Sequence, residues 1–259
     1  MNRNVVIIPA RWGSTRFPGK PLYQIAGKPL LRRAWERCRH ARKIDHTIIA
    51  TDDMRIAEAA FAWGAEVALT SPKHQSGTDR IAEVAARAKN FSIIINVQGD
   101  EPLIQHQLID RMVETLLKNR ELGIVTAAHR FENPRDALSL HQVKVVISRA
   151  GNALYFSRAP IPSSKTSGPT LFLRHQGIYG FRRAMLLQFV KWKTTPLEQA
   201  ESLEQLRALE NGVRVHVLVT KHGSPGVDTP ADAEAVAASL RKKSASAAGI
   251  RLQKLRARR

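Results

Sequence analysis

The sequence predicts an α/β protein built on a single doubly wound, mostly parallel sheet, with an inserted mixed β subregion. Two observations favour this fold class. Short runs that are apolar on both faces, such as residues 5–9 and 93–97, alternate with segments of helical periodicity, as they do where helices cover both faces of a parallel sheet. No Pro/Gly/Ser linker divides the chain and no internal repeat is present, so we expect one continuous unit over residues 1–240.

In the first hundred residues, predicted strands and helices alternate. Asp52 or Asp53 can cap the second helix, because an aspartate side chain accepts hydrogen bonds from the first free N–H groups of a helix. Strands joined through helices are parallel neighbours. We expect strands over residues 5–9, 46–51, 66–69 and 93–97, and helices over residues 30–42, 52–63 and 78–90.

The second half of the chain has shorter connections between its predicted strands, which favours antiparallel or mixed pairing. One helix is predicted to end at Gly212, a typical C-terminal stop. A last helix begins at Thr229–Pro230, since proline is favoured in a first turn. We expect strands over residues 123–128, 143–147, 153–157 and 214–220, and a helix over residues 196–211.

The composition predicts a cytoplasmic protein without disulfide bonds. The chain has 259 residues, of which 43% are hydrophobic, which is enough for a sizeable core. No run of 18 apolar residues occurs, and the apolar run at residues 5–8 is too short for a signal peptide. The single cysteine, Cys38, excludes an internal disulfide and a multi-cysteine metal site.

A formal net charge of +19 raises nucleic acid, acidic membranes and anionic small molecules as partners. Residues 241–259 carry eight lysines and arginines and no acid, so they are predicted to form a basic C-terminal tail outside the site. Aromatic residues make up only 6% of the chain, and no nucleic-acid-binding motif is found. A basic nucleic-acid-binding protein is therefore the less favoured alternative to an enzyme for anionic substrates.

The loop after the first predicted strand, residues 9–21, has the composition of a phosphate-binding loop. It holds two glycines, two arginines and Lys20, so backbone N–H groups and cations can both reach an anion. Five residues separate the glycines and Pro21 follows the lysine, which excludes a Walker loop, and no Gly-x-Gly pair exists for a dinucleotide fingerprint. The alternative is an ordinary basic surface loop.

At this loop the sequence resembles the sugar-acid cytidylyltransferases, and most closely the family of 3-deoxy-manno-octulosonate (KDO) cytidylyltransferases. Residues 7–11 and 14–22 carry the first part of the resemblance. It extends in the family's order over nearly all of residues 5–240. The further blocks are residues 74–80, 96–102, 155–158, 172–175, 177–180, 203–207 and 226–230.

The resemblance implies a nucleotide-diphospho-sugar-transferase-like variant of the Rossmann fold, with a nucleotidyltransferase catalytic domain over residues 1–240. It implies that the anomeric C2 hydroxyl of KDO attacks the α-phosphorus of CTP, giving CMP-KDO and pyrophosphate for lipopolysaccharide biosynthesis. It also implies Mg²⁺ as cofactor and a homodimer. The partners expected are therefore CTP and an acidic eight-carbon sugar, with no membrane span and no specific nucleic acid.

Two aspartates correspond to the family's metal ligands, Asp100 and Asp228. Asp100 follows the most apolar predicted strand, and Asp228 precedes the last helix. Mg²⁺ bound to nucleotide phosphates takes one or two carboxylates, so both suit it, although either could instead be a turn residue or cap. With Arg11 and Lys20 they form the expected catalytic set. The expected nucleotide-binding residues are Pro9, Ala10, Arg11, Lys20, Ser76, Gly77 and Thr78.

The sugar acid requires a cation and groups that exchange hydrogen bonds with hydroxyls. The resemblance assigns this role to a set drawn from several blocks, whereas Glu101 is not expected to bind metal and Asp79 is expected to serve as a helix N-terminal charge. Without the resemblance, the acidic run before residue 205 would be a solvated helix face. The expected sugar-binding residues are Arg80, Gln98, Arg158, His175, Tyr179, Glu204 and Gln205.

Three departures from the family pattern occur, and two of them, both glutamines, lie near the inferred sugar pocket. Gln199 stands where a histidine is expected, Gln176 replaces an apolar residue, and the connection Ser163–Leu171 is short. They leave the exact sugar open between KDO, an amino-substituted relative such as 8-amino-KDO, and a sialic acid.

Overall fold

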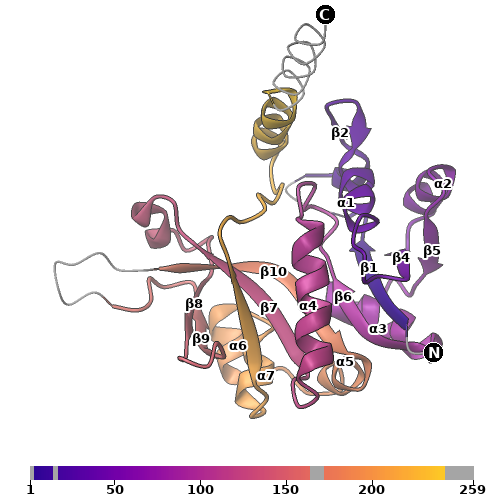
Figure 1. The fold of residues 1–259 in the computed structure, drawn as a ribbon. Helices are drawn as coiled ribbons and strands as arrows, with labels where there is room; N and C mark the ends of the chain where they lie inside the picture. Colours follow the sequence, from indigo (N-terminus) through magenta and orange to yellow (C-terminus); the bar gives the residue numbers. More distant parts are fainter. Residues whose placement is uncertain (1–2, 14–16, 164–171, 243–259) are drawn as a thin grey trace, which may run out of the picture.

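The computed structural model describes residues 3–13, 17–163 and 172–242. Four parallel strands form one half of its central sheet (Figure 1). Each follows an apolar run of the sequence, and β1 lies in the middle of the group, paired on either side. In order across the sheet the strands are β6 (Phe91–Asn96), β1 (Arg3–Ala10), β4 (His46–Thr51) and β5 (Glu66–Leu69).

The other half of the sheet is mixed. Strand β10 (Leu173–Arg182) runs antiparallel to β6 on one side and to β7 (Ile124–Arg130) on the other. Strand β11 (Val215–Thr220) closes this edge parallel to β7. A hairpin of β8 (Lys144–Ile147) and β9 (Ala153–Ser157) branches from β10. The predicted doubly wound sheet with a mixed β subregion is therefore confirmed.

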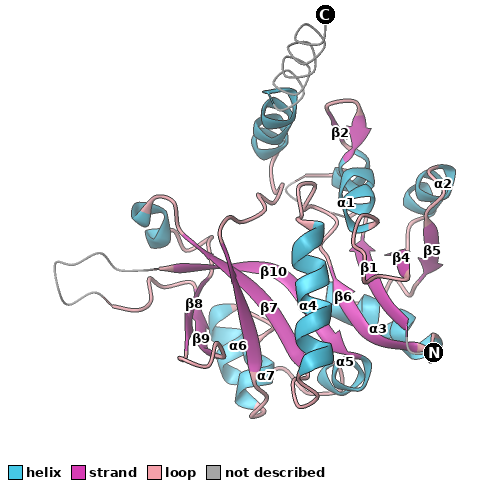
Figure 2. Cartoon of the chain, in the orientation of Figure 1, coloured by secondary structure: helices cyan, strands magenta, loops and turns pink. Residues whose placement is uncertain are grey.

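Helices cover both faces of the sheet (Figure 2). One face packs on α1 (Leu30–Cys38), α2 (Met54–Ala62) and α4 (His106–Lys118). The opposite face packs on α3 (Gly77–Arg87), α5 (Arg183–Phe189) and α7 (Leu206–Glu210).

The central strand β1 shows why this layering follows from the sequence. Val6 and Ile8 are buried in the core under α1, α2 and α4, while Val5 and Ile7 are buried in the core under α3 and α5. Successive strand side chains point to opposite faces, so a strand that is apolar throughout requires a helical layer on each side. Burial of each such side chain contributes about 1.5–3 kcal/mol.

The predicted helix over residues 196–211 is wrong, because two helices occupy this segment. Helix α6 (Pro196–Glu201) stops at Ser202, which has a left-handed backbone (φ 51°), and α7 begins at Leu206. The N–H of Leu203 bonds the carbonyl of Glu198, which closes the turn. The uninterrupted helix-forming composition concealed this break, and the break places Glu204 and Gln205 in a turn.

Other differences concern elements that were not predicted and helix ends. Strand β10 and helices α4 and α5 were not predicted, and α1 and α3 stop four and three residues before their predicted ends. Asp53 is the residue that caps α2, through a hydrogen bond from the N–H of Arg55. Small elements complete the fold: η1 (Lys20–Leu22), β2 (Gln24–Ile25), β3 (Lys28–Pro29) and η2 (Pro134–Leu138).

A final helix occupies residues 230–242, as the Thr229–Pro230 signal predicts. Its side chains Ala233 and Val236 join Val227 in a third core with Phe17 and Leu30. The predicted basic tail shares its first two residues with this helix, and the rest lies outside the described residues. Within the described part of the chain, every helix is too short or too polar to cross a membrane.

Candidate active site

A cleft of about 370 Å³ lies at the carboxyl edge of the parallel strands, where open α/β sheets bind their ligands. Its walls come from the ends of β1 and β6, the loop between β5 and α3, and η1. Ten of the predicted site residues line it: Pro9, Ala10, Arg11, Lys20, Ser76, Gly77, Arg80, Gln98, Asp100 and Asp228.

Lys20 is presented by the short helix η1, which begins after Gly19. Gly19 has φ 68°, a left-handed conformation that favours glycine, and a Cβ there would lie 3.2 Å from the Trp12 ring. The guanidinium of Arg55 also packs on Trp12, 3.7 Å from the ring centroid. The described ends of the phosphate loop are therefore fixed by packing around Trp12.

The two predicted metal ligands converge on one cation in this structure, the ammonium group of Lys20. Lys20 Nζ lies 2.6 Å from Asp100 Oδ2 and 3.6 Å from Asp228 Oδ1, and it donates to the carbonyl of Val227 at 3.0 Å. The N–H of Val227 also bonds the carbonyl of Asp100, so the two turns are joined directly. Two carboxylates that share a cation in this cleft are a donor set that fits Mg²⁺. No group of three or more His, Cys, Asp or Glu side chains arranged for a metal occurs among the described residues.

Helix α3 begins inside the cleft. Ser76 caps it by accepting from the N–H of Asp79, and Asp79 accepts in return from the N–H of Ser76. Asp79 is thus the helix N-terminal charge that the sequence predicts. At Gly77 a Cβ would lie 3.1 Å from Cγ of Pro9, so the absence of a side chain lets the loop pack against the end of β1.

A second, much smaller cavity of about 20 Å³ is lined by four other predicted residues, Thr78, Tyr179, Glu204 and Gln205. Thr78 Oγ1 donates to Glu204 Oε2 at 2.6 Å, which ties the turn after α6 to the start of α3. Burial raises the pKa of Glu204, and the hydrogen bonds from Thr78 and Ser76 oppose that shift. The Tyr179 hydroxyl and Gln205 Nε2 are buried without a hydrogen-bond partner among the described residues.

His175 lies beside this cavity, with its ring 5.4 Å from that of Tyr179 and 5.0 Å from that of Phe156. Burial lowers the pKa of His175 to about 3, so the ring is neutral at physiological pH. The Thr126 hydroxyl donates to the carbonyl of Ile178 at 2.8 Å, so it accepts from His175 Nε2 at 3.0 Å. His175 Nδ1 is then left as an unprotonated acceptor, and His175 cannot be the cation for a sugar carboxylate.

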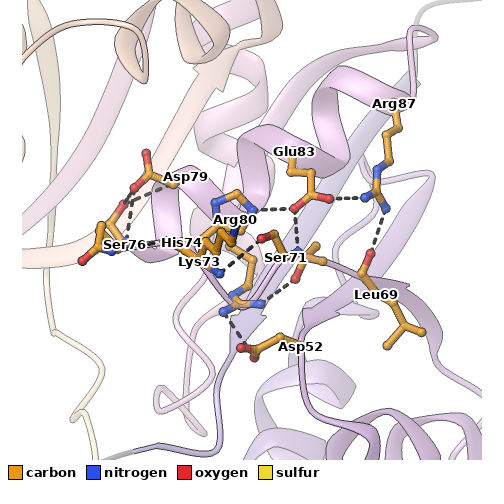
Figure 3. A network of polar contacts seen from close by, with 12 residues as sticks. Asp52, Leu69, Ser71, Lys73, His74, Ser76, Asp79, Arg80, Glu83 and Arg87 are labelled. Atoms are coloured by element: carbon orange, nitrogen blue, oxygen red, sulfur yellow. Dashed lines mark hydrogen bonds and ion pairs between the residues drawn. The ribbon is translucent and has the colours of Figure 1, made fainter.

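The two predicted sugar-binding arginines are held by other parts of the protein. Arg80 is buried in the cleft wall, where it donates to Thr70 at 2.5 Å and pairs with Asp52 at 3.2 Å (Figure 3). Arg158 lines neither cavity. Its guanidinium donates to the carbonyls of Glu201 (2.8 Å), Ser202 (3.3 Å) and Leu140 (3.2 Å).

The unusual glutamines also lie outside both cavities. Gln176 is buried and its side chain donates to Thr220 on β11, and Gln199 is exposed on α6. Neither gives a physical reason for a change of sugar. The segment Ser163–Leu171 lies almost entirely outside the described residues.

Sequence reasoning missed one prominent residue of the cleft. His74 lines the wall formed by the β5–α3 loop, and its Nε2 bonds the carboxylate of Glu83. Both residues belong to or adjoin the block over residues 74–80, so their nearness to the predicted Ser76–Gly77 loop was the available signal.

Comparison with known proteins agrees with this geometry. The cytidylyltransferase family model matches residues 5–215. The chain is 47% identical over 245 residues to a 3-deoxy-manno-octulosonate cytidylyltransferase of Geobacter metallireducens, with 90% of this chain and 96% of the relative covered. It is 49% identical over 231 residues to the enzyme of that name from Solibacter usitatus, covering 89% and 91%.

A solved structure of CMP:2-keto-3-deoxy-manno-octonic acid synthetase complexed with CTP is 38% identical, with a TM-score of 0.90 over 93% of this chain and all of the other. A cytidylyltransferase from Leptospira borgpetersenii, 18% identical with a TM-score of 0.63, shares the fold alone. The fold and the cleft define a nucleotidyltransferase. The chain belongs to the family of 3-deoxy-manno-octulosonate cytidylyltransferases.

Proposed function

We propose that this protein transfers CMP from CTP to KDO and releases pyrophosphate, in a magnesium-dependent reaction that supplies CMP-KDO for lipopolysaccharide biosynthesis. The observation that carries the proposal is the convergence of Asp100 and Asp228 on Lys20 Nζ at the cleft. This convergence brings a carboxylate pair and a cationic loop together at the place where a nucleoside triphosphate would lie.

The residues divide the reaction between them. Arg11 and Lys20 neutralise the charge that builds up on the departing pyrophosphate. Ser76 and Gly77, with the end of β1, hold the nucleotide in line for attack. When bound by Asp100 and Asp228, Mg²⁺ supplies charge neutralisation at the α-phosphate and lowers the pKa of the attacking hydroxyl. Lys20 must exchange its carboxylate partners for phosphate oxygens when substrate binds.

The acidic sugar is proposed to bind beside the second cavity, where His175, Tyr179, Glu204 and Gln205 are pre-positioned. Buried polar groups without partners cost about 1–3 kcal/mol each, and a ligand hydroxyl that pairs with them recovers that energy. The unpartnered atoms of Tyr179 and Gln205 and the acceptor Nδ1 of His175 therefore support a polyhydroxylated ligand. A site of this kind rejects a sugar that lacks the matching hydroxyls.

The test is pyrophosphate release from CTP and magnesium, with KDO, 8-amino-KDO, sialic acid or no sugar as acceptor. Release with KDO alone supports the proposed reaction and sugar. Release with another acid only would keep the reaction and change the substrate. If the folded protein releases nothing with any acceptor, the proposed function is wrong.

A cytoplasmic homodimer is also proposed. Leu138, Leu140 and Leu154, in the segment from η2 to β9, are each more than 60% exposed. If these side chains form one contiguous apolar patch in the folded protein, that patch is a surface suited to a second subunit. The mass measured by light scattering at micromolar concentration should be twice the chain mass, and Leu138→Asp/Leu154→Asp should halve it. A monomeric wild-type protein would contradict the homodimer.

A further inference from the structure

One residue that lines the cleft, His74, belongs to a histidine–carboxylate pair that the reaction above does not use. His74 lines the cleft in the β5–α3 loop, and its Nε2 contacts Oε2 of Glu83 on α3 (Figure 3). Both side chains are about one-fifth exposed. Glu83 is absent from the described lining of the cleft, so His74 lies between the carboxylate and the ligand space.

Glu83 is fixed by more than one contact. It accepts from the N–H of Ser71 at 2.9 Å and from the guanidinium of Arg87, and Arg87 also donates to the carbonyl of Leu69 at 2.8 Å. Figure 3 shows these groups arranged along one side of α3. The loop that carries His74 is thus tied to the helix at residues on both sides of the turn, which leaves the imidazole little rotational freedom.

The protonation state of the pair follows from these contacts. Burial raises the pKa of Glu83, but the hydrogen bonds from His74 and from the N–H of Ser71, with the charge of Arg87, lower it by more. Glu83 is therefore ionised at neutral pH and holds the proton of His74 on Nε2. His74 Nδ1 has no hydrogen-bond partner within the described part of the chain. The Nδ1 atom of His74 is thus held in a fixed orientation and can form a hydrogen bond with a ligand in the cleft.

The position of His74 indicates which part of a nucleotide it meets. Arg11 and Lys20 stand at the phosphate end, whereas His74 adjoins Ser76 and Gly77, which pack on the end of β1. We propose that His74 binds the nucleoside part of the nucleotide through Nδ1, and that Glu83 is the positioning residue that orients it. This inference rests on the proposed function.

The experiment measures the Kd of CTP and of CMP by calorimetry without sugar. His74→Gln keeps an N–H for Glu83 but has no atom in place of Nδ1. This substitution should raise the Kd of CTP and the Kd of CMP by the same factor, about tenfold, as expected for one lost hydrogen bond. A loss confined to CTP would assign His74 to the phosphates, and unchanged affinity for CMP would remove it from the site. Either result overturns the inference.

Two further variants separate positioning from folding. Glu83→Gln should raise the Kd of CTP and of CMP about threefold to fivefold. In the double variant it should add nothing to the effect of His74→Gln, because Glu83 acts through the ring of His74. Additive losses would overturn the positioning role. The matched control Lys118→Gln lies on the exposed last turn of α4, outside the lining of the cleft, and should leave both Kd values within twofold. The ¹⁵N resonance of His74 Nδ1, assigned by its loss in His74→Gln, should shift when CMP is added, and its failure to shift would contradict the contact.

The outcomes distinguish the two proposals. If wild-type protein binds CTP and CMP but the variants match it, the inference about His74 fails while the proposed function stands. If the wild-type protein binds neither ligand, the proposed function itself fails.

Discussion

The two ends of the proposed site, one for the phosphates of the nucleotide and one for the sugar, are built by different physical means. At the phosphate end, charged groups on separate loops meet at the open edge of the parallel strands, as Lys20 and Asp100 do at 2.6 Å. At the sugar end, His175 and Tyr179 on the antiparallel strand β10 are half-buried, and burial of their polar atoms favours the neutral form of each. Charges tolerate solvent, whereas neutral groups that are to bind hydroxyls selectively must be desolvated and held rigidly. The phosphate end therefore depends on charge, and the sugar end depends on the surrounding core.

The largest change in rate is expected for substitutions in the carboxylate pair of the phosphate end. Asp100→Asn and Asp228→Asn should each lower kcat at least about 100-fold. A neutral amide lacks the negative charge with which a carboxylate would bind the magnesium ion of the nucleotide. The melting temperature should change little, since both groups lie at the open cleft. Asp136→Asn, in η2, is the matched control and should keep the wild-type rate. A wild-type rate in Asp100→Asn would remove that residue from the catalytic set.

The next effect concerns the sugar end. Tyr179→Phe deletes a buried hydroxyl that has no partner among the described residues, so no internal hydrogen bond is lost. The melting temperature should stay equal or rise, while the KM of the sugar rises about tenfold and the KM of CTP stays within twofold. Tyr23→Phe, outside both cavities, is the control. An unchanged sugar KM would show that the phenol lies outside the sugar site.

A smaller effect tests the boundary between the two ends, where Glu101 follows Asp100. Burial, then the charge of Asp100, raise the pKa of Glu101 to about 8, against 4.5 in an exposed chain, while Arg174 opposes the shift. The folded protein therefore keeps this proton over a pH range in which the unfolded chain loses it. The free energy of unfolding then falls as pH rises from about 4.5 to 8.

Glu101→Gln imitates the protonated side chain and removes this dependence. The melting temperature of the variant should exceed that of the wild type by at least about 2 °C at pH 8 and match it at pH 4.5, as scanning calorimetry would detect. Glu121→Gln, on the exposed surface, should show no such trend. A gain that is equal at both pH values would contradict a buried proton on Glu101.

The smallest catalytic effect is expected from the basic tail. Truncation after Lys242 keeps the helix that packs on Val227 and removes six lysines and arginines. We expect kcat/KM within twofold of the full chain, together with weaker and less salt-sensitive retention on DNA. If the truncated protein remains on DNA at the same salt concentration, the nucleic-acid-binding alternative gains support.

That the residues of the proposed phosphate end line one cleft could be predicted from the sequence, because the prediction depends on local features. Strand β4 begins and ends at the predicted residues, and the predicted loop carries Lys20 to the cleft. The rule that ligands meet the carboxyl ends of parallel strands then brings residues as distant as Gly77 and Asp228 together. Arg158 shows the limit of this reasoning, since its guanidinium is held by backbone carbonyls that no sequence pattern announces.

The doubly wound parallel sheet, the chemistry of the loop after β1 and the family could all be inferred from the order of the amino acids. This is possible because periodicity, glycine positions and charge act over a few residues. Three other features became visible only in the folded chain: the break of the helix at Ser202, the antiparallel placement of β10 between β6 and β7, and the contact of Glu83 with His74. These depend on contacts between residues distant in sequence, whose energies exceed the local preferences of the segments that make them.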